Sequence, residues 1–146
     1  MGMENYRTAS HSKTALKAHL VWVPKYRKKV LFGDTAIRVR DLVREVCQAK
    51  DVEIISGKVA VDHVHLFIAY PPHLSISNIM KLIKGRSSHK LLSENKLLRQ
   101  KFWGGHFWAR GYFAVSSGNI TDEMIMDYIE EQNGENIQTD NFQITK

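Results

Sequence analysis

The chain has 146 residues, 43% of them hydrophobic, and its 21 Lys and Arg against 15 Asp and Glu give a net charge of +6. This length fits one domain with an ordinary core, which excludes a disordered chain and a small protein that depends on disulfides. The basic balance favours a polyanionic partner, nucleic acid ahead of an anionic membrane, although a merely soluble basic protein has the same balance.

The single cysteine, Cys47, excludes an internal disulfide and a cysteine-based zinc site, and it suits a reducing cytoplasm. No apolar run approaches the roughly 18 residues that span a bilayer, and the polar N-terminus does not resemble a signal peptide. We therefore expect a cytoplasmic protein with no membrane partner. It should form a single domain over residues 1–146, in which residues 1–15 are a flexible arm or an extension left from cloning.

The first predicted elements are a strand and a helix. Residues 17–24, "KAHLVWVP", alternate in polarity and end at a proline, which is typical of a strand. A basic turn, "KYRKKVLFGD", follows. Apolar residues at helical spacing then predict a helix over about 35–50, with Asp34 as a plausible N-cap.

Two further strands are predicted next, over residues 52–60 and 62–70. The second ends at "PP", and Gly57 marks a bend or bulge in the first. Because the short "SGK" is the only break between the two runs, we expect an antiparallel hairpin.

The second half of the chain is predicted to contain a long helix, a strand and a final helix. The long helix begins at Ser75, and Gly85 interrupts its pattern and could kink it. The strand covers about 107–115, and the final helix covers about 121–132. The order β-α-β-β-α-β plus a helix is that of a ferredoxin-like or RRM-like α+β sandwich, with a four-stranded antiparallel sheet and two helices on one face.

The strand over 62–70 carries apolar side chains on one face and two histidines, His63 and His65, on the other. The face that carries the histidines is also rather apolar, so the last helix or a second subunit should cover it. Two imidazoles two residues apart project together and can converge on one metal ion, although each could also be a hydrogen-bonded core histidine.

The final helix offers further candidate ligands, because Tyr128 and Gln132 lie four residues apart on one face. A glutamine carbonyl and a phenol can both bind metals. From the helix alone, an ordinary core tyrosine and a surface glutamine are the favoured explanation of the pattern.

Basic residues suggest contacts to nucleic-acid phosphates, although each could be a solvated surface charge. The candidates are Lys25, Arg27, Lys28, Lys29, Lys81, Lys84, Arg86 and Arg110. Trp103, Phe107 and Trp108 could stack on bases or pack in the core.

Four segments carry a resemblance to a known family: "AVDHVHLFIAYPP", "SISNIMKLIKGRSS", "FWARGYFAVSSGNIT" and "YIEEQ". The chain resembles, from about Lys17 to Gln132, the small single-tyrosine HUH transposases, the TnpA proteins of the smallest bacterial and archaeal insertion sequences. HUH denotes His, a hydrophobic residue, and His.

The resemblance implies that His63, His65 and Gln132 bind the metal, Mg²⁺ or Mn²⁺, and that Tyr128 is the nucleophile. It also implies a homodimer that acts on single-stranded DNA hairpins at transposon ends, with a hinge that residues 117–119 suit. The expected reaction cleaves and rejoins single-stranded DNA through a 5′-phosphotyrosine link. Alternatives are a non-catalytic RRM-like nucleic-acid-binding protein and another HUH endonuclease of the relaxase or replication-initiator type.

Overall fold

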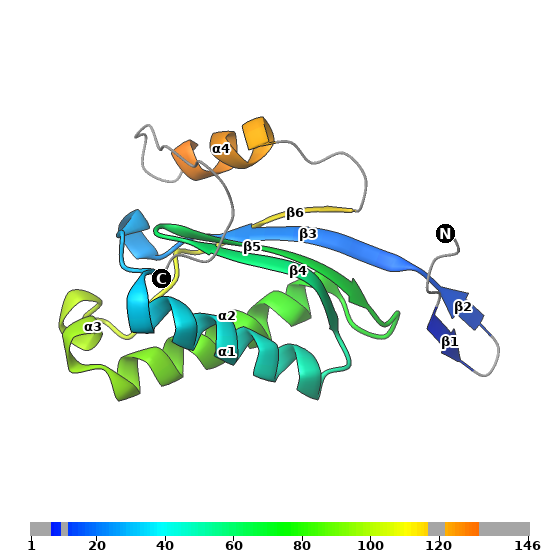
Figure 1. Cartoon of the computed structure of the whole chain (residues 1–146), viewed down its shortest axis with the longest axis horizontal. Helices are drawn as coiled ribbons and strands as arrows, with labels where there is room; N and C mark the ends of the chain where they lie inside the picture. Colours follow the sequence, from blue (N-terminus) through cyan, green and yellow to red (C-terminus); the bar gives the residue numbers. More distant parts are fainter. Residues whose placement is uncertain (1–6, 10–11, 117–121, 132–146) are drawn as a thin grey trace.

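A computed structural model describes residues 7–9, 12–116 and 122–131. In chain order the elements are β1 (Arg7–Ala9), β2 (Ser12–Thr14), β3 (Leu16–Trp22), the 3₁₀ turn η1 (Lys25–Arg27), α1 (Gly33–Ala49), β4 (Glu53–Ala60), β5 (His63–Tyr70), α2 (Ile76–Glu94), α3 (Lys96–Lys101), β6 (Phe113–Ser116) and α4 (Asp122–Glu131). Figure 1 shows three layers, with α1 and α2 on one face of the main sheet and α4 over the other.

The main sheet has four strands in the order β4-β5-β3-β6, and every pairing is antiparallel. The two central strands, β3 and β5, are therefore the first and third of the four in the chain. This topology confirms the predicted ferredoxin-like α+β sandwich.

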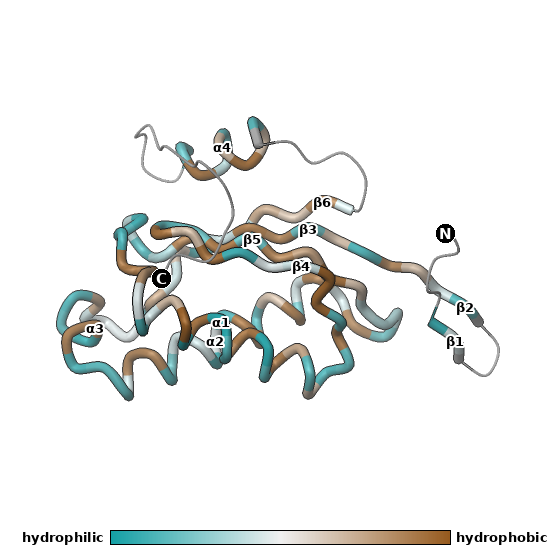
Figure 2. The backbone as a smooth tube through the Cα atoms, viewed as in Figure 1, coloured by the Kyte–Doolittle hydropathy of each residue, from teal (hydrophilic) through white to brown (hydrophobic). Residues whose placement is uncertain are grey.

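The larger core lies between the sheet and the helices α1 and α2. Trp22 and Ile68 from the central strands, Leu42 from α1 and Ile83 from α2 are all fully buried there. Figure 2 shows brown, hydrophobic stretches along the two central strands and teal stretches on the outer side of α1 and α2. Strand alternation and helical periodicity therefore turn their apolar faces toward a common interior.

The opposite face of the sheet is covered by α4. Val21 and Val23 from β3 and its C-terminal end pack with Ile125 and Ile129 from α4, and all four are buried. Of the two covers that the sequence allowed, the last helix provides one within the same chain. The apolar character of this face therefore no longer argues for a second subunit.

The β4–β5 hairpin is confirmed, but its details differ from the prediction. β4 continues to Ala60 and pairs with His63, so Val61 and Asp62 make the turn and "SGK" lies inside the strand. The register shift falls between Ile54 and Ser56 rather than at Gly57.

The helices differ from the sequence predictions at two points, the N-cap of α1 and the interruption expected at Gly85 in α2. Phe32, not Asp34, is the residue before α1, and Asp34 lies in the first turn, where a carboxylate complements the helix dipole. Ser75 caps α2 by accepting a hydrogen bond from the Asn78 amide. Gly85 does not interrupt the long helix, since α2 continues through it.

The strand predicted over 107–115 is divided. Phe107 and Ala109 exchange backbone hydrogen bonds with residues 23–25, and β6 begins only at Phe113. Between them Gly111 has a φ of 80°, a left-handed conformation that glycine adopts readily and that breaks a strand. The short helix α3 was not predicted.

Part of the segment predicted as a flexible arm forms a small hairpin. β1 and β2 pair antiparallel, and Arg7 contacts Asp51 Oδ2 and the Ala69 carbonyl, each at 3.0 Å. Across the described ranges 7–9, 12–116 and 122–131, no helix is long and apolar enough to cross a bilayer.

Candidate functional site

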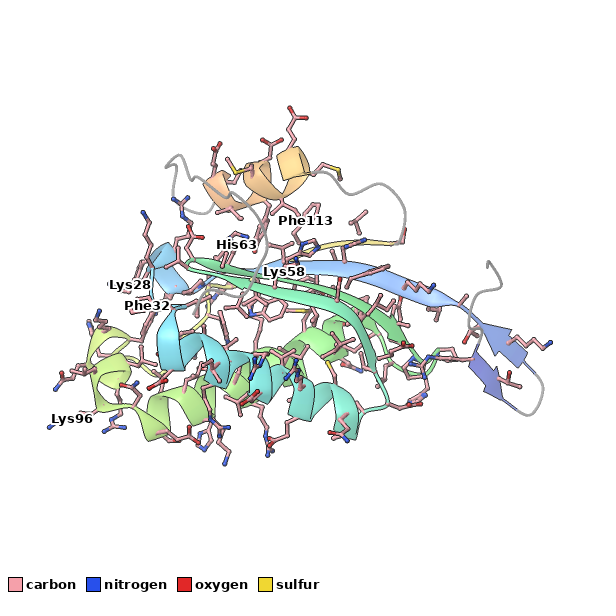
Figure 3. All side chains as sticks on the ribbon, viewed as in Figure 1. Lys28, Phe32, Lys58, His63, Lys96 and Phe113 are labelled. Atoms are coloured by element: carbon pink, nitrogen blue, oxygen red, sulfur yellow. The ribbon has the colours of Figure 1, made fainter. Side chains whose placement is uncertain are left out.

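The two histidines lie on β5, on the face of the sheet that α4 covers. His63 is fully buried and His65 is half-buried, while Val64 between them points into the larger core. His65 pairs with Val21 across the sheet, and Val21 pairs in turn with Phe113. Figure 3 shows His63 and Phe113 on the α4 side of the sheet. The predicted common face of the two imidazoles is thus present.

A carboxylate fixes the orientation of His63. Its Nδ1 lies 3.0 Å from Asp62 Oδ1, and because a carboxylate only accepts, the ring N–H donates. Asp62 is itself 1% exposed. This arrangement places the proton on Nδ1 and assigns Nε2 as the nitrogen with which His63 would bind a metal.

A third histidine adjoins His65. His19 Nδ1 lies 3.1 Å from His65 Nε2, and the His19 ring stacks on Phe67 with centroids 4.1 Å apart. Burial, together with the nearby His19, lowers the pKa of His65 to about 4. Burial also lowers the pKa of His19. At neutral pH both imidazoles are therefore uncharged.

These features fit a divalent metal. A neutral imidazole presents a lone pair, and a carboxylate behind a histidine is the usual support for a metal ligand. Among the described residues no group of three His, Cys, Asp or Glu could hold a metal ion. Gln132, the expected third ligand, falls outside the described residues.

Tyr128 is carried by α4 on the same side of the sheet. Its ring packs on Phe113 with centroids 5.7 Å apart, beside the Ile125 and Ile129 cluster. Burial raises the pKa of the phenol to about 12. The hinge predicted at residues 117–119 lies outside the described residues.

A buried arginine connects α4 to the histidine pair. Arg27 Nη1 donates to the Ile129 carbonyl at 3.1 Å, and Arg27 Nε lies 3.6 Å from Asp62 Oδ2. Arg27 reaches this position because it and Tyr26 adopt left-handed φ values of 52° and 59°. With only 4% of Arg27 exposed, the predicted phosphate contact by this residue is corrected to a role inside the protein.

A comparison with known protein families matches residues 12–132 to the family described as "Transposase IS200 like". The chain belongs to this family. Among curated relatives, the transposase for insertion sequence element IS200 of Salmonella typhimurium is 33% identical over 130 residues, covering 89% of this chain and 85% of the relative. The ISDra2 transposase TnpA of Deinococcus radiodurans is 34% identical over 117 residues, covering 80% and 84%.

Solved structures agree with this assignment. A crystal structure of a candidate transposase from Deinococcus radiodurans matches with a TM-score of 0.80 and 30% identity, covering 86% of this chain and 97% of the other. A tyrosine transposase bound to a REP hairpin matches with a TM-score of 0.54 and 19% identity, covering 90% and 75%. At that identity the second match supports the fold alone. The predicted transposase resemblance is confirmed.

The other residues predicted to contact DNA differ in whether their charged groups are already bonded to other groups of the protein. Lys84 is half-buried, and its ammonium donates to the Ala109 and Gly111 carbonyls at 2.7 Å each. Arg86 is exposed and pairs with Glu45 at 3.1 Å. The remaining candidates lie at the surface or partly buried and stay predictions: Lys25, Lys28, Lys29, Lys81 and Arg110.

Sequence reasoning assigned no role to His19 or Asp62. The alternation of residues along β3 could have identified His19, because it falls on the same face as Val21 and on the opposite face from Trp22. The aromatic candidates separate by exposure. Phe107 and Trp108 are buried, whereas 84% of Trp103 is exposed.

Proposed function

We propose that this transposase cleaves and rejoins single-stranded DNA at the ends of an insertion sequence, using Tyr128 as nucleophile and a divalent cation bound by His63, His65 and Gln132. The observation that carries the proposal is the placement of the tyrosine-bearing α4 over the histidine face of the sheet, joined to Asp62 through Arg27.

The reaction exchanges one phosphodiester for another. The Tyr128 oxygen attacks the phosphorus, a bond from tyrosine to phosphorus forms, and the bond from phosphorus to the 3′ oxygen breaks. The phenol loses its proton to solvent and the leaving 3′ oxygen gains one. A 5′-phosphotyrosine link and a free 3′-OH result, and attack by a 3′-OH reverses the step without an external energy source.

The described residues prepare both partners for this exchange. Asp62 holds the His63 ring in one tautomer, and the low pKa of His65 keeps its ring uncharged. To bind a cation through Nε2, His65 would exchange its contact with His19 Nδ1 for the metal. When bound, Mg²⁺ or Mn²⁺ would neutralise charge on the scissile phosphate. Imidazole nitrogen suits Mn²⁺ better than Mg²⁺, whereas cellular abundance favours Mg²⁺.

The packed position of Tyr128 keeps its phenol protonated at neutral pH, because its pKa is about 12. The phenol has to lose this proton as it attacks, and burial against Phe113 makes that loss harder than for an exposed tyrosine.

The proposed partners are a DNA hairpin and a second copy of the chain. The fold shared with a tyrosine transposase bound to a REP hairpin supports the hairpin, and the net charge of +6 supports a nucleic-acid partner. The dimer rests on family membership. Light scattering at micromolar concentration tests it, and a mass of one chain would contradict it.

A covalent-capture assay tests the reaction. The protein is incubated with a single-stranded hairpin substrate and Mg²⁺ or Mn²⁺, and products are separated under denaturing conditions. Wild type should give a protein–DNA adduct, and Tyr128→Phe should give none. His63→Ala should also abolish the adduct while leaving DNA binding measurable. If wild type gives no adduct, or Tyr128→Phe gives as much, the proposed reaction is wrong; binding alone would fit a non-catalytic protein.

A further inference from the structure

A cavity of about 560 Å³ lies between α2 and the segment 105–110, separate from the histidine pair. Its volume falls within the range of pockets that hold small molecules or single nucleotides. Three hydrogen bonds pin the segment onto α2: from the Phe107 amide to Ser88 Oγ at 3.1 Å, and from Trp108 Nε1 to Ser87 Oγ and Lys84 Nζ to the Ala109 carbonyl, at 2.8 and 2.7 Å. The cavity is thus a preformed feature of the fold.

The lining of this cavity is cationic. Lys25 and Arg110 contribute positive charges, Lys84 contributes an ammonium that is already bonded to two backbone carbonyls, and His89 and His106 add two imidazoles. None of the described residues that line it is acidic. Burial among these groups lowers the pKa of Lys84. A concave surface with one sign of charge concentrates its field on a ligand of the opposite sign.

Gly85 provides an independent observation. Glycine is among the poorest helix formers, yet Gly85 lies inside the continuous helix α2. Neither backbone geometry nor packing requires it, because its φ is not positive and a Cβ built there would meet nothing within 4 Å. Since Gly85 lines the cavity, the missing side chain leaves open a space that most other residues would occupy.

The cavity lies at the same end of the sheet as the histidine pair. β3 ends and β5 begins there, since Trp22 pairs with Val64. The turn η1 contributes residues both to the cavity and to the histidine site. Lys25 lines the cavity, whereas Arg27, two residues later, contacts Asp62 and α4. One short turn therefore connects the cavity with the histidine site.

We propose that this cavity binds a nucleotide of single-stranded DNA through its backbone phosphate, with Lys25 and Arg110 as the phosphate contacts. The assignment rests on the proposed function, which makes single-stranded DNA the substrate. It adds a subsite in which the strand is held on the helix side of the sheet, at a distance from the residues that react.

Two variants test the cavity by different means. Gly85→Leu fills it without removing a charge, and Arg110→Ala removes a charge without filling it. Matched controls are Ser93→Leu, on an exposed position of the same helix, and Arg44→Ala, an exposed arginine on α1. The thermal midpoint of each variant is measured first. Gly85→Leu should unfold at the wild-type temperature or above, because leucine is the better helix former.

Binding is then measured by fluorescence anisotropy with a labelled single-stranded oligonucleotide over a range of salt concentrations. Each cavity variant should weaken binding about fivefold or more, while both controls should bind like wild type. Arg110→Ala should also lower the salt slope by about 0.7, the value for one lost phosphate contact on a single strand. If both cavity variants match wild type in affinity and in slope, the proposal is wrong; if Gly85→Leu does not fold, Arg110→Ala decides alone.

The covalent-capture assay separates this proposal from the proposed reaction. The cavity variants should form the adduct only at higher DNA concentrations than wild type, in proportion to their weaker binding, whereas Tyr128→Phe should bind DNA like wild type and form no adduct. Weakened binding by the cavity variants with no wild-type adduct would support the cavity and overturn the reaction. Normal binding by the same variants together with a wild-type adduct would support the reaction and overturn the cavity. Weakening seen only with an RNA oligonucleotide of the same sequence would overturn the assignment to DNA.

Discussion

Arg27 and Asp62 form an ion pair inside the protein, with Nε 3.6 Å from Oδ2 and side chains only 1% and 2% exposed. The carboxylate also accepts from His63 Nδ1, and the guanidinium also donates to the Ile129 carbonyl, next to Tyr128. One continuous set of contacts therefore links a proposed metal ligand to the helix that carries the proposed nucleophile. Both ends of the site depend on a single buried charge pair.

Arg27→Ala should be strongly destabilising. It leaves the Asp62 carboxylate buried without its cation, and breaking a buried pair in this way costs about 3–5 kcal/mol. The control is Arg38→Ala, which removes a two-point contact to Glu94 at 2.8 and 2.9 Å on the surface. Since exposed pairs are screened by water, that variant should change stability little. Urea unfolding of both compares them, and equal losses would contradict the assigned role of Arg27.

Asp62→Asn should weaken metal binding, and because it also leaves the Arg27 guanidinium buried without its anion, it should lower the stability of the fold as well. Asparagine keeps the size of the side chain, but the His63 ring loses the charged acceptor that sets its tautomer. Loss of such a support typically costs 10–100-fold in metal affinity, roughly the effect expected for Mn²⁺ here.

Calorimetric titration with Mn²⁺ measures this effect, with Glu45→Gln as an exposed control at the Arg86 pair. His63→Ala sets the floor, because it removes a ligand. Affinity in Asp62→Asn equal to wild type, alongside lost binding in His63→Ala, would show that the carboxylate does not support the ligand.

The fold could be predicted from the sequence because its signals are periodic. Alternation along residues 62–70 placed Val64 and Ile68 on one face and His63 and His65 on the other. The structure keeps that division, with the two apolar residues on the helix side. Helical spacing found α1 and α2 in the same way. Element boundaries were less accurate, since turns and left-handed residues such as Gly111 carry no period.

The role of Arg27 could not be read from the sequence. In "KYRKK" five neighbouring residues include four cations, and nothing in their order marks which one turns inward. The left-handed backbone at Tyr26 and Arg27 decides it, by directing Arg27 under α4. The cavity was missed for a similar reason, because His89 and His106 come together only when the segment 105–110 folds back on α2.

The raised pKa of Tyr128 predicts a distinct alkaline titration. Tyrosine ionises ordinarily near pH 10, and desolvation in the folded state raises the pKa of Tyr128 to about 12. Its contribution to stability is therefore complete below pH 10 and is lost as the pH rises from about 10 to about 12.

Absorbance at 295 nm follows this ionisation in the folded protein. Wild type should show a late ionisation step, and Tyr128→Phe should lack that step. If the difference between the wild-type and Tyr128→Phe curves is one tyrosine that ionises near pH 10 rather than late, the packed position of Tyr128 is contradicted.

Ile125→Ala should release α4 without unfolding the domain. Ile125 is 1% exposed and belongs to the small cluster with Val21, Val23 and Ile129, which is separate from the larger core around Trp22. Loss of a buried isoleucine costs about 2–5 kcal/mol, and because few other apolar contacts hold α4, the cost should fall on its docking.

Hydrogen exchange separates this local effect from a global one. Amides of α4 should lose protection in Ile125→Ala, while those of α1 and β5 keep theirs. Ile83→Ala, a change of the same size in the larger core, should lower protection throughout. The Tyr128 pKa should also fall toward 10 in Ile125→Ala, since its burial depends on the same docking. Uniform loss of protection across both cores would show instead that α4 and the sheet unfold as one unit.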